Sequence, residues 1–572
     1  MQTHMDAHAS RARMRTHPYP GRRCRSPYGE APLSVCIRNL GVYRVVHIMC
    51  DMQQSEQSKD RRPSGTAPTS LHSLDENNEM ERGLTNKHVQ FIAIGGAIGT
   101  GLFLGAGKSI NLTGPSIVLV YIAVGIMMFI MMRGIGELMY RDPSQHTFIN
   151  FIRMYLGNGW GKFALWSYWI VLVLIGMTEI TAVGQYCVTF FGTLGFDLSA
   201  WQWLIELCFL VALVGINLIA VKVFGEAEFW FSMIKITLIV VMIVTAVVML
   251  IAGYKYGATQ VPGQDHVSPA GSVTVRNITD GFQLAPNGWV SLLMSFQMVF
   301  FAYEMIEFVG VTVSETKNPR KVLPKAVNGI IVRVLIFYVG ALLAIMTIVP
   351  WRNFAPNEDG SFTSPFIMVF EFAGLHWAAA LVFFVVLTAA ASSLNSLLYS
   401  AGRHLFQLAN ESVSPTLSKL GTVSKAKVPA RAIIASGCLV LLSPIVSALP
   451  GVSGAFVLFS SASSAVIIFI YILTMVAHYR YRKSPEFMPD GFLMPAYKVL
   501  DPLVIAFFVF IYGTLFIAAD TRWPAIAGLG WLLLFGGYCL LKNRHETRGR
   551  REFAEVRDAE RRSAGMADLD DR

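Results

Sequence analysis

The chain has 572 residues, of which 53% are hydrophobic and only 15% are charged, and its mean hydropathy is +0.49. This composition excludes an ordinary soluble globular protein. The formal net charge of +10 could suggest a nucleic-acid partner, but the basic residues gather in the gaps between long apolar runs. That distribution is typical of a membrane protein whose loop charges set its orientation. We therefore expect a lipid bilayer, and no nucleic acid, as partner.

Residues 1–80 precede the first apolar run. The first fifty are rich in Arg, His and Pro and contain no apolar segment of the kind that a secretory signal needs. We expect residues 1–80 to form a disordered cytoplasmic N-terminus. We also expect translation to start at Met52, which would make residues 1–51 a mis-assigned start. A basic arm lying on the membrane surface is the alternative.

Residues 81–545 contain twelve apolar runs, and a cytoplasmic tail is expected over 546–572. A bilayer core of about 30 Å needs about 20 residues of helix, and uninterrupted runs of this length are helices rather than the alternating strands of a barrel. The fold class is therefore all-α integral membrane, with 12 transmembrane helices. The predicted spans are 89–109, 115–140, 162–192, 200–221, 228–252, 288–313, 327–349, 376–402, 431–449, 454–479, 499–519 and 523–542.

An even number of spans places both termini on the same side of the membrane. The loops on that side carry most of the loop Lys and Arg, among them Arg133, Lys325, Arg403 and Arg482. By the positive-inside rule this side is cytoplasmic. We read Arg133 and the neighbouring Glu137, at the end of the second span, as interface and gate residues that bind no ligand.

The first and sixth spans contain features that weaken a membrane helix. The first, "FIAIGGAIGTGLFLGAG", holds six glycines, and each glycine inside a helix costs about 1 kcal/mol relative to alanine. The sixth carries Glu304 and Glu307, where lipid would not tolerate them. Each of these spans opens a block of five, so the two blocks have opposite orientations. This pattern predicts a transporter built from an inverted repeat, with helices 1 and 6 broken at the membrane midplane.

A break at the midplane leaves backbone groups that need partners, and a zwitterionic amino acid supplies both kinds. Backbone amides in the first span would receive its carboxylate, and carbonyls in the sixth would accept from its ammonium group. A small-residue packing face, in which Gly95 and Gly99 or Gly101 and Gly105 contact another helix, is the alternative. The backbone positions expected to bind substrate are Ile98, Gly99, Thr100 and Gly101 in the first span and Phe300 to Tyr303, including Ala302, in the sixth.

Several longer motifs resemble the bacterial amino-acid permeases of the amino acid–polyamine–organocation superfamily. They are "IAIGGAIGTGLFLGAGKSINLTGPSI", "FGEAEFWFSMIKI", "FVGVTVSETKNPRKVLPKAVN" and "SSLNSLLYSAGRHLFQLA". The nearest resemblance is to proton-coupled D-serine/D-alanine/glycine permeases. It implies the leucine-transporter-type fold, with spans 1–5 and 6–10 as the 5+5 inverted repeat and two appended helices. It also implies a multi-pass protein of the bacterial plasma membrane that uses no cofactor or metal.

The substrate expected from this resemblance is a small neutral amino acid, such as glycine, alanine or serine, D forms included, imported with a proton. Two motifs depart from that pattern. "GMTEITAVGQY" in the third span looks more like aromatic-amino-acid permeases, and "AYEMIE" replaces the usual Phe-x-Gly-x-Glu, so that Met305 stands for the glycine. An aromatic or broad neutral amino-acid permease, or an amino-acid exchanger, is therefore the alternative.

Lys235 lies in the fifth span, seven residues after Glu228, which is about 10 Å along a helix. It could be a lysine whose amine reaches the membrane interface. Similar permeases carry a lysine where sodium-coupled relatives bind sodium, and this resemblance implies that Lys235 exchanges the coupling proton. Its expected neighbours are Ser392, Ser393 and Ser396. A coupling site of this kind argues against obligatory exchange.

Other candidate residues surround the expected substrate site. The resemblance implies that Glu307 helps to form a gate. Glu304 could bind the substrate or face an aqueous vestibule, and Glu179 could make a structural hydrogen bond or take part in transport. Phe300 and Tyr303 are candidate lids.

Three other protein classes are weaker interpretations. A membrane enzyme would need a convergent catalytic set, yet the histidines lie mostly in loops and tails and no HExxH or GxSxG motif is present, so we predict that the protein is not an enzyme. A channel would not need two broken helices in inverted halves. An amino-acid sensor on the same fold would bind substrate without net flux, and a flux measurement distinguishes it.

Overall fold

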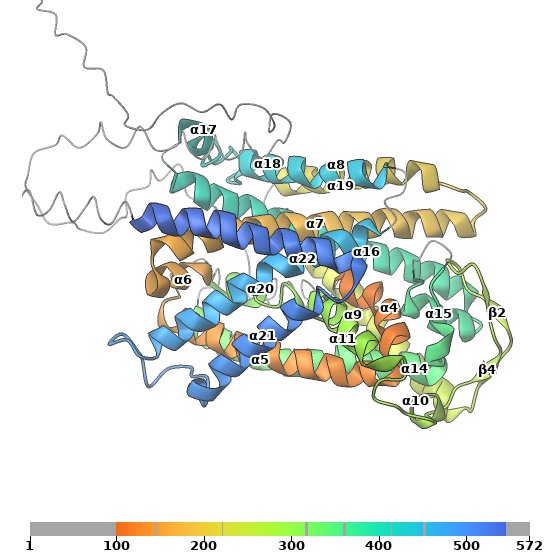
Figure 1. Ribbon diagram of the computed structural model, residues 1–572. Helices are drawn as coiled ribbons and strands as arrows, with labels where there is room; N and C mark the ends of the chain where they lie inside the picture. Colours follow the sequence, from red (N-terminus) through yellow and green to blue (C-terminus); the bar gives the residue numbers. More distant parts are fainter. Residues whose placement is uncertain are drawn as a thin grey trace, which may run out of the picture. The chain divides into compact units, whose positions relative to one another are not determined.

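The computed structural model describes residues 99–143, 145, 147–219, 221–314, 318–357, 362–412, 414–449 and 454–544 (Figure 1). The predicted N-terminal region, residues 89–98 of the predicted first span and the predicted C-terminal tail lie outside these residues. The described part is almost entirely helical, with two small pairs of strands.

Eleven helical stretches in the described part are long and apolar enough to cross a membrane. They confirm predicted spans two to twelve, whereas the first span and the total of twelve remain predictions. Several stretches are built from consecutive helices. The elements are α4 (Gly105–Thr113), η3 (Gly114–Ser116) and α5 (Ile117–Arg141); α7 (Asn158–Thr193); η4 (Ser199–Trp201) and α8 (Gln202–Ile219); α9 (Val221–Ile251); α11 (Gly288–Tyr303) and α12 (Phe308–Ser314); α13 (Pro319–Arg333), the π-helical η5 (Val334–Gly340) and α14 (Ala341–Ile348); α16 (His376–Asn410); α18 (Ala430–Val440) and α19 (Leu442–Ser447); α20 (Ala455–Tyr481); α21 (Tyr497–Thr514); and α22 (Ala519–Trp531) with the π-helical η7 (Leu532–Gly536).

The remaining helical elements are short and connect or flank the membrane helices. They are α3 (Thr100–Phe103), α6 (Ile149–Leu156), α10 (Arg276–Thr279), η6 (Trp351–Asn353), α15 (Pro365–Phe372) and α17 (Pro415–Ser418).

The long helix α7 packs along both α16 and α20 (Figure 1). These three helices are mostly buried, whereas α8, α21 and α22 are mostly exposed. The exposed faces carry large apolar side chains such as Trp203, Val211, Trp523 and Leu534. Side chains of this kind on the outside of a helix fit contact with lipid, because a helix satisfies its backbone hydrogen bonds internally.

The predicted break in the sixth span is present in the described part, whereas the break in the first span remains a prediction, because the residues before Gly99 lie outside that part. Gly99 is extended (φ −107°, ψ −165°), and α3 starts at the next residue. The sixth span is divided between Tyr303 and Phe308, where α11 ends and α12 begins. α11 packs against α3, α4 and α20, and α16 packs against α3. The start of α3 and the break in the sixth span are therefore adjacent, beside the buried helices α16 and α20.

Two nested pairs of antiparallel strands lie between α9 and α10. β1 (Lys255–Tyr256) pairs with β4 (Gly271–Ser272), and β2 (Thr259–Gln260) pairs with β3 (Val267–Ser268). The Tyr256 hydroxyl donates to the carbonyl oxygen of Ile348 at 2.9 Å and so ties the strands to α14. Burial raises the pKa of Tyr256 to about 12, so this donor keeps its proton. A side chain at Gly271 would collide with the Tyr256 hydroxyl, at 2.4 Å from a Cβ atom.

Candidate functional site

A small cavity lies between the start of α3 and the break in the sixth span. Its volume is about 20 Å³, which is room for about one water molecule, so the lining must move apart to admit an amino acid. Two carboxylates and one hydroxyl face it among otherwise apolar or glycine residues. In the described part of the chain its lining is Gly99, Gly101, Ile175, Glu179, Phe301, Ala302, Glu304, Met305 and Ser393.

Glu179 projects from α7 to the start of α3. One of its carboxylate oxygens, Oε1, accepts from the backbone N–H of Thr100 at 3.4 Å and from the Ser393 hydroxyl at 3.0 Å. The other oxygen, Oε2, is buried and has no hydrogen-bond partner among the described residues. A buried carboxylate oxygen without a donor is costly, so this cavity favours a ligand that brings a cationic donor.

The glycines at the start of α3 allow close approach. A Cβ atom on Gly99 would lie 2.8 Å from Glu179 Oε1, and one on Gly101 would lie 2.6 Å from the Cα atom of Ala302 in α11. Gly101 therefore also serves helix packing, as the alternative interpretation predicted, and that packing brings the start of α3 and the end of α11 together. Ile98 lies outside the described residues.

The interruption in the sixth span has an uncommon backbone conformation. Met305 has a φ of +69°, a left-handed conformation that costs a non-glycine residue about 1–2 kcal/mol. Beside it the carboxylate of Glu304 accepts from the hydroxyls of Ser463, at 2.9 Å, and Ser464, both in α20. Glu304 is therefore held at the cavity wall by α20.

Glu307 lies on the other side of the same turn, outside the cavity lining. Its two carboxylate oxygens accept from the hydroxyls of Tyr168 in α7, at 3.3 Å, and Tyr471 in α20, at 2.6 Å. This carboxylate joins α7 and α20 to the broken helix, and the gate role implied by the resemblance remains a prediction.

Lys235 is completely buried in α9, at a depth where its amine is enclosed by protein rather than placed at an interface. The negative charges that act on it are those of Glu228, which has the larger effect, and Glu179. Glu228 accepts from the Ser392 hydroxyl at 2.5 Å. Ser392 and Ser393 are adjacent in α16, and Ser396, also predicted as a neighbour, is buried on the same helix. Glu228, Ser392 and Ser393 thus provide polar groups between Lys235 and the cavity.

Phe300 and Tyr303 lie outside the cavity lining, so we do not retain them as lids. The Phe300 ring packs against Phe508 and Tyr471, at centroid distances of 6.0 and 6.2 Å. Tyr303 stacks on Tyr338 at 4.7 Å, and its hydroxyl donates to a backbone oxygen of α5. The orientation of α11 about its own axis places both rings in aromatic clusters. Sequence composition does not reveal this orientation.

The carbonyls at the end of α11 already have donors within the protein. The Glu304 N–H lies 3.1 Å from the carbonyl oxygens of both Phe300 and Phe301. The Tyr338 hydroxyl donates to the carbonyl oxygen of Ala302 at 3.0 Å. Each carbonyl oxygen has two lone pairs, so these atoms can still accept from an ammonium group, but they are not orphaned by the break.

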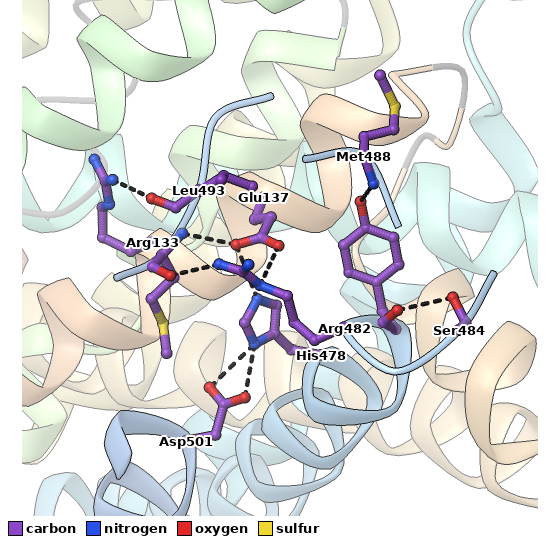
Figure 2. Close-up of polar contacts among 10 residues, drawn as sticks. Arg133, Glu137, His478, Arg482, Ser484, Met488, Leu493 and Asp501 are labelled. Carbon is purple, nitrogen blue, oxygen red and sulfur yellow. Dashed lines mark hydrogen bonds and ion pairs between the residues drawn. The ribbon is translucent and has the colours of Figure 1, made fainter. Parts of the chain in front are cut away.

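A second group of buried charges joins α5, α20 and α21 at the predicted cytoplasmic side (Figure 2). Glu137 forms ion pairs with His478 Nε2 at 3.2 Å and Arg482 Nε at 2.6 Å, and it accepts from the N–H of Met494 at 2.7 Å. The other ring nitrogen of His478 lies 2.9 Å from Asp501. We call Glu137, His478, Arg482 and Asp501 the end cluster. Glu137 is only 2% exposed within this network, and its interface and gate role remains a prediction.

Three features of these sites were not predicted as functional. Glu228 was noted only as the start of the fifth span, although an acid seven residues before an intramembrane lysine is itself a signal. The Ser463–Ser464 pair sits in the serine-rich run "SSASS", which reads as a small-residue packing face. The pairing of His478 with Asp501 links two different spans, so no short sequence motif predicts it.

Comparisons with known proteins agree with this architecture. The family model described as amino acid permease matches residues 88–556. The chain is 43% identical over 472 residues to the serine permease of Lactococcus lactis, covering 82% of this chain and 100% of the relative. It is 45% identical over 465 residues to the DL-alanine permease of the same organism, covering 81% and 96%. It is 39% identical over 468 residues to the D-serine/D-alanine/glycine transporter of Escherichia coli, covering 80% and 94%.

The chain is therefore a multi-pass membrane protein of the amino acid permease family. The relatives named above are transporters, and the resemblance seen in the sequence is confirmed.

Proposed function

We propose that the protein is a secondary active transporter that imports small neutral amino acids, including glycine, alanine and serine and their D forms, together with a proton. The observation that carries this proposal is the cavity between the start of α3 and the break in the sixth span, with the unpartnered Glu179 oxygen inside it. The names of the relatives, which include serine, DL-alanine and D-serine/D-alanine/glycine transport, support the choice of substrate. Enantiomers fit the same scheme, since capture of a carboxylate and an ammonium group is not by itself chiral.

The cavity would hold the amino-acid moiety through two kinds of contact. The Thr100 N–H, which now donates to a carboxylate oxygen of Glu179, would donate to the substrate carboxylate instead. The substrate ammonium group would bind Glu179 Oε2 and would also donate to carbonyl oxygens at the end of α11. Ile175, Phe301 and Met305 would limit the size of the substrate side chain.

Proton coupling would use the polar groups between Lys235 and the cavity. Glu228 and Glu179 both act on the buried lysine, and Ser392 and Ser393 bind one carboxylate each. Glu179 both lines the cavity and acts on the charge of Lys235, so occupancy of the cavity and the protonation state of Lys235 would be linked through this carboxylate.

Transport would proceed by alternating access around this fixed site. We propose that α3 and α4 with α5, and α11 to α14, move against the remaining helices, and that α21 and α22 are the two appended helices of a 5+5 inverted repeat. The Ser364 hydroxyl, just before α15, donates to the carbonyl oxygen of Phe103 at 2.7 Å and so ties α15 to α3. Both termini would be cytoplasmic, in the bacterial plasma membrane.

The test is uptake of radiolabelled alanine and serine by the full chain in liposomes, with and without an inward proton gradient. The variants are Lys235→Ala and Lys235→Arg, in which arginine keeps the charge but does not release its proton. Lys108→Ala is the matched control, since it removes a partly exposed lysine that pairs with Asp520.

We expect gradient-driven accumulation in the wild type and the Lys108 variant. Both Lys235 variants should lose it, and Lys235→Arg should retain exchange. Exchange that ignores the gradient and survives in Lys235→Ala would instead mean an antiporter. Uptake that only phenylalanine or tyrosine competes away would overturn the choice of substrate.

A further inference from the structure

Glu304 lines the same cavity as Glu179 and Ser393 but comes from another part of the fold. Glu179 and Ser393 come from α7 and α16, whereas Glu304 follows the end of α11 and is held by α20. Its exposed fraction is 5%. The described lining contains no basic side chain. A carboxylate in this position therefore favours a ligand that brings a hydrogen-bond donor.

The hydrogen bonds of Glu304 leave it able to accept more. Each carboxylate oxygen accepts one serine hydroxyl, and a carboxylate oxygen can accept two hydrogen bonds. One lone pair on each oxygen is therefore unused, in a cavity whose lining also includes the apolar side chains of Ile175, Phe301 and Met305. A ligand group that contacts this wall therefore binds most favourably when it is small and donates a hydrogen bond to Glu304.

We propose that Glu304 is a specificity-determining residue that selects substrates with a hydroxyl group on the β-carbon, so that serine is preferred over an apolar amino acid of the same size. This inference rests on the proposed amino-acid transport. A site built to bind a hydroxyl discriminates strongly against an analogue without it, because its buried polar group is then left with an unmet hydrogen bond. Ser463 and Ser464 act as positioning residues that aim the Glu304 carboxylate.

The chain offers a variant that removes the carboxylate with little other damage. The hydroxyls of Ser463 and Ser464 also lie 2.9 Å from the carbonyl oxygen of Ser460. That oxygen therefore offers either hydroxyl an alternative acceptor when Glu304 is replaced by an apolar residue of similar length. Glu304→Met should leave no unsatisfied donor in α20, and Ser464→Ala is a second variant that keeps the carboxylate but loosens it.

The experiment measures initial uptake rates of serine and of 2-aminobutyrate, in which a methyl group replaces the serine hydroxyl, by the full chain in liposomes. We expect the wild type to favour serine about tenfold or more, as the loss of one hydrogen bond to a charged group implies. The ratio should fall to about one in Glu304→Met and to an intermediate value in Ser464→Ala. A residue with a merely structural role would lower both rates by the same factor.

A wild-type ratio near one, or a ratio that Glu304→Met leaves unchanged, would overturn this inference while leaving the proposed transport intact. Absence of any neutral amino-acid uptake by the wild type would instead overturn the proposed function itself. If Glu304→Met does not fold, the ratio in Ser464→Ala decides alone, because its expected fall is specific to serine.

Discussion

The cavity and the end cluster both hold carboxylates buried among membrane helices, but they differ in how completely those carboxylates are paired. In the end cluster Glu137 contacts His478, Arg482 and a backbone N–H, and Asp501 contacts the far side of the same histidine. In the cavity, Glu179 has one oxygen without a partner among the described residues. Charges that hold a structure together are paired inside the protein, whereas charges that bind a ligand are left with capacity for it.

The largest expected effect on stability comes from opening the end cluster. His478→Ala removes the residue that both carboxylates share, so that two charges stay buried with fewer partners. Breaking a buried network of this kind costs about 3–5 kcal/mol. Thermal unfolding of the purified protein in detergent should show a clear loss of stability.

The control for that change is an ion pair at the same end of α5. Arg141 contacts Glu486 at 2.6 Å, but the side chains are 19% and 49% exposed. Arg141→Ala should therefore cost less than about 1 kcal/mol. Equal losses in the two variants would contradict the distinction between a buried network and a surface pair.

The next effect tests the contact between α3 and α11. A Cβ atom on Gly101 meets the backbone of Ala302, whereas one on Gly105 meets the flexible side chain of Met298 at 2.7 Å. Gly101→Ala should cost about 1–3 kcal/mol through overpacking and abolish uptake, because the cavity wall must shift. Gly105→Ala should retain most uptake. Normal uptake by Gly101→Ala would show that this contact does not shape the site.

The smallest effect concerns strained backbone. Ala496, an exposed residue just before α21, has a φ of +45°, and Met305 in the cavity wall has a φ of +69°. Ala496→Gly should stabilise the protein by about 1 kcal/mol, since glycine adopts this conformation readily, and should leave uptake unchanged.

Met305→Gly relieves a similar strain but deletes a buried side chain, so it should be destabilising on balance and should change uptake. A gain in stability with normal uptake in both variants would contradict a functional role for the Met305 conformation.

Much of this architecture could be predicted from the sequence because its causes are local. A run of about 20 apolar residues determines a span, and Glu304 and Glu307 marked the break in the sixth span because acids in lipid need partners. The partners themselves were not predictable. Ser463 and Ser464 meet Glu304 across a long separation in sequence, and the packing of α11 against α20 brings them together. The rotation of α11, which turns Phe300 and Tyr303 away from the cavity, is likewise set by tertiary packing.

The most direct test of the central claim is equilibrium binding of radiolabelled serine to the purified protein, measured with Glu179→Gln and Glu137→Gln beside the wild type and corrected for the folded fraction. Glutamine keeps the shape of either side chain and removes its charge. We predict that Glu179→Gln weakens binding by about tenfold or more, as loss of a charged hydrogen bond implies, with little change in thermal stability. Glu137→Gln should lower stability and leave the affinity of the folded protein unchanged. The opposite pattern, with affinity lost only in the Glu137 variant, would show that the cavity is not the substrate site.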